Sequence, residues 1–147
     1  ENPNRMKTNM IYWNMDTIAG VVFDLDVSKA KGNRVMIKGV DRNFDGQVDG
    51  SFQLFKRYKV SLNSYRYGGG GGHFKGIGMD AATIKKRTLF YSATGLRDYL
   101  IKYIQEENRG SIAPKAIGNW KVVPEQWAKK GRSKDDPLIF WPGASGR

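Results

Sequence analysis

Apolar and polar residues alternate along the first half of the chain, which is the pattern of half-buried β-strands. Residues 17–28 place an apolar side chain at every second position. Residues 34–40 form a second alternating run, with Val35 and Ile37 on the expected inner face. The longest alternating run covers residues 51–67. These runs predict neighbouring antiparallel strands that are joined by turns.

A helical period replaces the alternation in residues 95–108. The apolar side chains there recur three and four residues apart, which predicts an amphipathic helix with one apolar stripe: Leu96, Tyr99, Leu100, Tyr103 and Ile104. Leu100 lies in the middle of the stripe and is expected to be buried against a sheet. We therefore predict an α+β fold with a curved antiparallel sheet of about five to seven strands. One main helix (about 95–108) packs on this sheet, and the C-terminal segment is irregular.

The length of 147 residues fits a single domain over 1–147. Residues 1–10 predict a flexible N-terminal arm, and residues 142–147 predict a polar C-terminal tail. No apolar run reaches the roughly 18–20 residues that a membrane span needs. The chain has no cysteine, so disulfides and thiolate metal sites are excluded. Neither the cellular compartment nor the natural N-terminus follows from the sequence.

The charge of the chain narrows the class of partner. Lys and Arg total 25 against 14 Asp and Glu, which gives a formal net charge of +11. The excess is present on both sides of residue 73, so it is not confined to a tail. A domain with this imbalance repels itself, and an anionic partner offsets the repulsion. Nucleic acid is the most common such partner, although the charge does not distinguish DNA from RNA.

The outer face of the run 51–67 interleaves aromatic and cationic side chains. Bases stack on aromatic rings while cations contact phosphates, so a sheet face of this kind favours a binding platform for single strands. The predicted nucleic-acid contacts on and after this run are Phe55, Arg57, Lys59, Tyr65, Arg66, Tyr67, Lys75, Lys85, Lys86 and Arg87. The leading hypothesis is therefore a non-catalytic protein that binds nucleic acid or another polyanion.

The sequence GVDRNFDGQVDG at residues 39–50 raises the possibility of a metal site. Oxygen-bearing side chains recur there as candidate ligands: Asp41, Asn43, Asp45 and Asp49. The stretch resembles the D-x-N-x-D-G loops of secreted calcium-binding modules, which implies a calcium site. The twelfth position of such a loop supplies a bidentate Glu, and here it is Phe52. Two interpretations stay open, a weak calcium site and a turn whose Asp side chains cap their own backbone. No other cofactor is predicted.

An enzyme is the main alternative to a binding protein. His73, the single histidine, follows five glycines that are expected to form a mobile loop, and it could serve as a general base. Residues 45–59 resemble the metal-binding strand of PD-(D/E)xK nucleases, which implies roles for Asp45, Asp49 and Lys56. The resemblance is incomplete because Gln53 and Lys56 would point to opposite faces of a strand. This alternative is a small nuclease or toxin-like ribonuclease.

A third alternative is a structural subunit of a virion or filament. In that case the arm, the glycine loop and the C-terminal aromatic residues would form contacts between subunits in a homo-oligomer.

Overall fold

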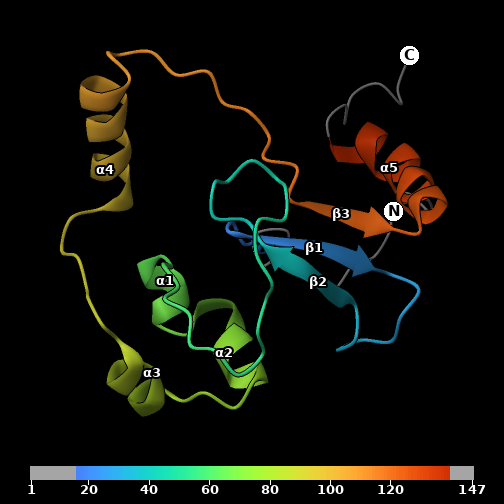
Figure 1. Ribbon diagram of the computed structural model, residues 1–147, viewed down its shortest axis with the longest axis horizontal. Coiled ribbons are helices and arrows are strands. Elements are labelled where there is room, and N and C mark those ends of the chain that lie inside the picture. Colours follow the sequence, from blue (N-terminus) through green and yellow to red (C-terminus); the bar gives the residue numbers. More distant parts are fainter. Residues whose placement is uncertain (1–15, 140–147) are drawn as a thin grey trace. The chain divides into compact units, whose positions relative to one another are not determined.

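The computed structural model describes residues 16–139, and it describes side chains as far as residue 133. The predicted arm (1–10) and tail (142–147) lie outside the described residues. The chain divides into two compact units (Figure 1). Unit 1 contains the residues up to 55 and those from 116 onward, and unit 2 contains residues 56–115. The single domain over 1–147 stays a prediction.

Two strands of unit 1 form a hairpin. β1 (Val21–Asp26) and β2 (Val35–Val40) pair antiparallel, and a bulge follows Val22. Both strands lie in the alternating runs near the N-terminus, where β-branched residues favour extended backbone. The two strands therefore confirm local predictions from the sequence.

The third strand joins this hairpin from the far end of the chain. β3 (Trp120–Val123) runs parallel to β1, so the strand order is β2-β1-β3 (Figure 1). Phe23 is paired with Trp120, and the two rings stack with centroids 6.1 Å apart. Among the side chains that the structure describes, Phe23 is the one buried hydrophobic residue, at 8% exposure. The core of unit 1 is therefore centred on β1.

Asn119 connects β3 to the chain that enters β1. Its buried side-chain amide donates to the carbonyl oxygens of Ile18 at 2.7 Å and Val21 at 2.8 Å. Its own carbonyl accepts a hydrogen bond from the Phe23 amide at 3.0 Å. Backbone carbonyls that are shielded from water are normally hydrogen-bonded, and one amide side chain supplies the donors for two of them here. Asn119 thus holds together segments about one hundred positions apart.

α5 (Glu125–Ile139) follows β3 directly. The Pro124 carbonyl accepts hydrogen bonds from the Trp127 and Ala128 amides. Proline is favoured at helix starts because its fixed φ suits the first turn. An ion pair between Lys129 and Glu125, 2.8 Å apart, adds a contact between successive turns. The prediction of an irregular C-terminal segment is therefore wrong for these residues.

Unit 2 is built from short helical segments. In chain order they are α1 (Ser64–Tyr67), η2 (Gly70–Gly72), α2 (His73–Gly76), α3 (Ala81–Arg87), α4 (Leu96–Lys102) and the wide π turn η3 (Tyr103–Glu107). The glycine run is thus folded into turns. In the described part of the chain, no helix has the length and apolar character that a membrane span requires.

The predicted sheet is wrong in size and direction. The structure has a small mixed sheet of three strands and several helices. Residues 51–63 contain no strand, and the segment from the end of β2 to residue 63 shows one isolated bridge, between Val40 and Gly50. Alternation identifies side chains that share a face, but a strand also needs a partner for its backbone groups. The segments 73–79 and 87–92 form helical turns and coil, so they add no strand to this sheet.

The predicted helix near 95–108 is present as α4 and η3, but its expected packing is wrong. Leu100 is 51% exposed, and the other large side chains of the α4 stripe are exposed as well. Val35 and Ile37 of β2 are also exposed, contrary to their expected inward direction. A periodic stripe shows that side chains share a face, but it does not supply a layer to cover that face.

Candidate functional site

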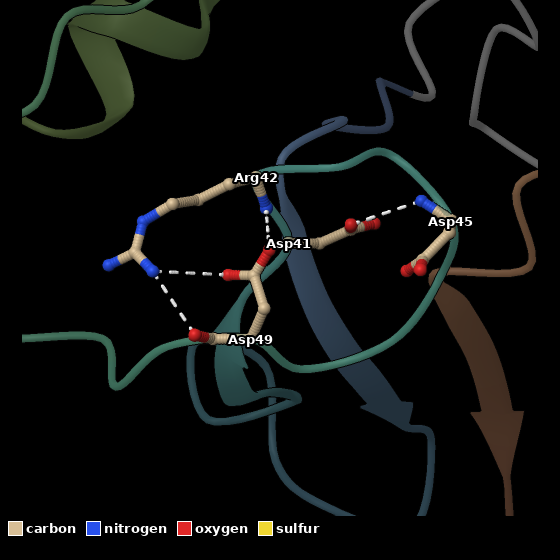
Figure 2. Close-up of polar contacts among 4 residues, drawn as sticks. All are labelled: Asp41, Arg42, Asp45 and Asp49. Carbon is tan, nitrogen blue, oxygen red and sulfur yellow. Dashed lines mark hydrogen bonds and ion pairs between the residues drawn. The ribbon is translucent and has the colours of Figure 1, made fainter.

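The acidic loop after β2 is closed by its own side chains. Asp41 is fully buried, and its two carboxylate oxygens accept hydrogen bonds from the amides of Asp45 at 3.1 Å and Gly46 at 3.0 Å. The Asp45 carboxylate accepts one more from the Gln47 amide. Figure 2 shows the Asp41 side chain pointing toward the backbone of Asp45. These are the contacts of a turn in which Asp caps neighbouring N–H groups.

Asp49 is engaged in a separate contact with Arg42. Its carboxylate accepts a hydrogen bond from the backbone amide of Arg42 at 2.8 Å (Figure 2). The same carboxylate lies 3.4 Å from the Arg42 guanidinium, which also donates to the backbone carbonyl of Asp49. The carboxylates of Asp41 and Asp49 therefore serve different partners. Within residues 16–133, no group of three or more His, Asp or Glu side chains is arranged to hold a metal ion.

Gly46 fixes the position of this loop against the segment before β3. Its φ of +84° is in the left-handed region that favours glycine. A Cβ there would collide with the carbonyl oxygen of Ile117. The glycine that suggested a calcium loop is therefore explained by backbone conformation and close packing.

The predicted platform is not a sheet face, because residues 51–63 form no strand. Phe55 is fully exposed, at 101% of its reference area, and Arg57 and Lys59 are exposed too. Lys56, a candidate nuclease residue, lies over the ring of Tyr58 at 5.9 Å. His73, the candidate general base, is the first residue of α2 and is exposed.

Several predicted binding residues of unit 2 instead meet around one pocket. The pocket has a volume of about 620 Å³ and lies between the glycine-rich turns and α3. It is lined by Tyr67, Gly68, Gly69, Phe74, Lys75, Gly78, Met79, Asp80, Ala81, Ile84 and Lys85. Tyr67, Lys75 and Lys85, which the sequence selected as binding residues, thus lie around one pocket. They are placed there by helical turns and not by a sheet. Lys86 and Arg87 lie on α3 but do not line the pocket.

Local hydrogen bonds build the glycine-rich wall of this pocket. The Asn63 side chain caps α1 by accepting the Arg66 amide at 2.9 Å. Gly69 and Gly71 adopt φ values of +87° and +77°, which residues with a Cβ rarely adopt. The run therefore needs glycine for its turns and not only for freedom of movement.

α3 forms the opposite wall. Asp80 caps this helix by accepting the Thr83 amide at 2.7 Å. Hydrogen bonds from the Thr83 side chain and then its amide hold the pKa of the Asp80 carboxyl below its ordinary value of 3.8, and desolvation partly opposes the shift. The Met79 amide donates to the Phe74 carbonyl at 2.9 Å, which fixes the connection between α2 and α3. Asp80 is therefore present as a carboxylate at neutral pH.

Tyr67 is held by contacts beyond the pocket. Its ring lies 5.8 Å from that of Tyr91, and its hydroxyl accepts from Thr88 at 3.4 Å. The Thr88 hydroxyl also contacts the Ile84 carbonyl at 2.9 Å. These contacts place the ring of Tyr67 beside the glycine turns. Tyr67 belongs to α1 and not to a strand.

The pocket combines three kinds of chemistry. Tyr67 and Phe74 offer aromatic surface, Asp80 offers acceptor oxygens, and Lys75 and Lys85 offer positive charge. Sequence reasoning missed Phe74 and Asp80. Asp80 is a residue type favoured at the N-cap, and its place directly before residues 81–87 could have indicated the start of α3.

The comparisons with known proteins give one similarity. The chain is 31% identical over 124 residues to the trifunctional nucleotide phosphoesterase protein YfkN of Bacillus subtilis (strain 168). The aligned region covers 81% of this chain but 8% of that protein. The chain therefore spans less than a tenth of the relative's length. No protein-family model and no solved structure match the chain.

Proposed function

We propose that this chain binds phosphorylated nucleosides in the pocket of unit 2. The observation that carries the proposal is the pocket's combination of aromatic rings, one carboxylate and two lysines. Residues 56–115 contain 12 Lys and Arg against 4 Asp and Glu, a net charge of +8, so an anion is attracted to this unit. The proposed ligand is thus a single nucleotide, which is the repeating unit of the nucleic acid that the sequence suggested as a partner.

Each pocket group has a partner on such a ligand. Phe74 and Tyr67 can stack on a base, which is worth about 1–3 kcal/mol per base when the aromatic residue is removed. The Asp80 carboxylate has acceptor capacity beyond its bonds to Thr83, and ribose hydroxyls can donate to it. Lys75 and Lys85 can neutralise a phosphate as mobile point charges.

The similarity to a nucleotide phosphoesterase supports a nucleotide ligand in particular. Because the chain corresponds to a small part of that protein, we assign it recognition of the nucleotide and not cleavage of the phosphoester.

Calorimetric titration with AMP, adenosine and ribose 5-phosphate tests the proposal. AMP should bind more tightly than either fragment, because it alone engages the rings and the lysines together. Phe74→Ala should weaken AMP and adenosine, whereas Lys75→Ala with Lys85→Ala should weaken AMP and ribose 5-phosphate. Lys102→Ala removes a lysine that pairs with Glu106 outside the pocket, and it serves as the charge control.

Two results would contradict the proposal. Absence of AMP binding at millimolar concentration would reject the pocket as a nucleotide site. Release of phosphate from AMP by the purified chain, lost in the pocket variants, would show that the chain is itself an enzyme.

A second candidate function is binding of single-stranded nucleic acid along residues 55–59. Full exposure of Phe55 next to three cationic side chains favours it. Phe55→Ala should then weaken binding of a single strand by about 1–3 kcal/mol. Arg57→Ala and Lys59→Ala should each reduce the slope of log K against log salt by about 0.7. If only the cationic changes matter, this segment is an electrostatic patch without stacking.

For the acidic loop we propose a structural role with calcium binding that is weak at best. The Asp41 and Asp49 carboxylates already accept backbone amides, and the bidentate Glu is missing. A calorimetric titration that gave submicromolar calcium affinity would overturn this assignment.

A further inference from the structure

The side chain of Arg66 is buried at 8% exposure, which is unusual for a cation in a unit with a large positive charge. Its guanidinium lies 5.2 Å from the centre of the Tyr65 ring. It also donates a hydrogen bond from Nη1 to the Gly70 carbonyl at 3.1 Å. Burial of a charge is costly unless its donors are engaged, so these contacts fix the side chain in one place.

The hydrogen bond between Arg66 and Gly70 closes a ring around three residues. Those residues are Tyr67, Gly68 and Gly69, and all three line the pocket. The Gly69 amide donates to the Arg66 carbonyl at 3.0 Å inside the same ring. The wall of the pocket is therefore the segment that Arg66 encloses.

Gly70 completes this arrangement through close packing. A Cβ on Gly70 would lie 2.6 Å from the Tyr65 ring, closer than real Cβ contacts allow. The ring of Tyr65 thus packs against both the guanidinium and Gly70, beside the hydrogen bond that joins those two residues. Five consecutive glycines would otherwise sample many conformations, because no Cβ restricts their φ and ψ.

We infer that Arg66 is a positioning residue for nucleotide binding, which holds Tyr67, Gly68 and Gly69 in the conformation that receives the base. The inference rests on the proposed function of the pocket. It assigns Arg66 to the base side of the site and not to the phosphate, although a guanidinium is a common phosphate ligand. A loop that is already held in its binding conformation loses less entropy when the ligand binds.

The three ligands distinguish these two roles in Arg66→Met. If Arg66 positions the wall, adenosine and AMP should both bind roughly tenfold more weakly or worse, which corresponds to one lost hydrogen bond from a charged group. Ribose 5-phosphate should keep its affinity within about a factor of two. Arg66→Lys retains a cationic donor and should restore part of the loss. Arg97→Met, on exposed α4, removes the same charge and should leave all three affinities unchanged.

Two further measurements test whether Arg66 holds the glycine-rich wall, independently of the ligand titrations with Arg66→Met. Amide hydrogen exchange of Gly68–Gly70 in the ligand-free chain should accelerate in Arg66→Met and not in Arg97→Met. Gly70→Ala should weaken adenosine binding with Arg66 intact, because the new methyl group displaces Tyr65.

The outcomes separate the inference from the function on which it rests. Unchanged adenosine and AMP affinities in Arg66→Met, while the unmodified chain binds AMP, would overturn the inference and leave the proposed function standing. Loss of AMP and ribose 5-phosphate binding with adenosine unaffected would show that Arg66 is a phosphate ligand. Failure of the unmodified chain to bind AMP would overturn both.

Discussion

Unit 1 is organised by contacts between segments about one hundred positions apart, whereas the contacts of unit 2 span from a few residues to the 24 positions between Tyr67 and Tyr91. In unit 1, Asn119 bonds to the segment before β1, and β3 pairs with β1. In unit 2, the caps at Asn63 and Asp80 reach three residues forward. The comparison teaches that the two units should respond differently to the same kind of mutation.

The two units also differ in net charge. The residues of unit 1 include 13 Lys and Arg against 10 Asp and Glu, a net charge of +3, while unit 2 has +8. In the described part of unit 1, Asp41 and Asp49 each accept hydrogen bonds from backbone amides of the acidic loop. Unit 2 has few such partners for its cations, which is why it is the better candidate for an anionic ligand.

The largest contrast is expected between two apolar truncations. Phe23→Ala removes the buried ring of unit 1 and should lower the free energy of unfolding by about 3–5 kcal/mol. Leu100→Ala removes a half-exposed side chain of unit 2 and should cost about 1 kcal/mol or less. Urea denaturation measures both. A large loss from Leu100→Ala would show that the α4 stripe is covered after all.

Asn119→Ala should be the next largest effect. It leaves the carbonyls of Ile18 and Val21 without their donor, and each unsatisfied buried group costs about 1–3 kcal/mol. The sum is roughly 2–4 kcal/mol in urea denaturation, because water can reach part of the site. Asn108→Ala is the control in unit 2, where one exposed amide donates to the Tyr103 carbonyl. Equal losses from the two changes would remove the distinction between long-range and local contacts.

Two glycine substitutions test the comparison with smaller expected changes in stability. Gly46→Ala forces a Cβ onto a φ of +84° and against Ile117, so it should destabilise the chain by about 1–3 kcal/mol. Gly76→Ala in α2 meets no atom within 4 Å, and it should stabilise by about 0.5–1 kcal/mol. Thermal unfolding followed by circular dichroism gives both values. A neutral Gly46→Ala would mean that the acidic loop is not packed on the segment before β3.

The smallest expected effect is a pH dependence. Hydrogen bonds from the Ser28 hydroxyl, at 2.6 Å, and from its amide hold the pKa of Asp26 below its ordinary value, while burial opposes them. Because the folded pKa is lower than the unfolded one, the stabilisation is present above about pH 4 and is lost as pH falls through the folded pKa.

Denaturation of Ser28→Ala and of the unmodified chain between pH 7 and pH 2 checks this dependence. The unmodified chain should lose more stability on acidification than the variant does. Thr83→Ala provides the matched test in unit 2, where Asp80 is exposed and salt should screen the effect more strongly. Identical pH profiles for Ser28→Ala and the unmodified chain would contradict the assignment.

The candidate site was only partly predictable. Tyr67, Lys75 and Lys85 were selected because aromatic and basic residues cluster in this part of the sequence, and they do line one pocket. Phe74 and Asp80 were missed, because a pocket depends on how the glycine turns bring α2 and α3 together. Arg66 was selected as a surface contact, yet its side chain is buried. Composition indicates which chemistry is available but not which side chains turn inward.

The sequence by itself determined the features that depend on neighbouring residues. These are the strand pair β1 and β2, the helix within 95–108 and the excess of positive charge. Their causes are side-chain period, caps and composition, which act over a few positions.

Only the tertiary structure decided the parallel pairing of β3 with β1, the burial of Asp41 and Arg66, and the exposure of the α4 stripe. Local pattern cannot decide these features. Closing a long loop costs conformational entropy whatever its sequence. Only the contacts between the segment and its distant partner offset this cost. Residues 51–63 illustrate the point, since they alternate as a strand would but lack a partner strand in the described chain.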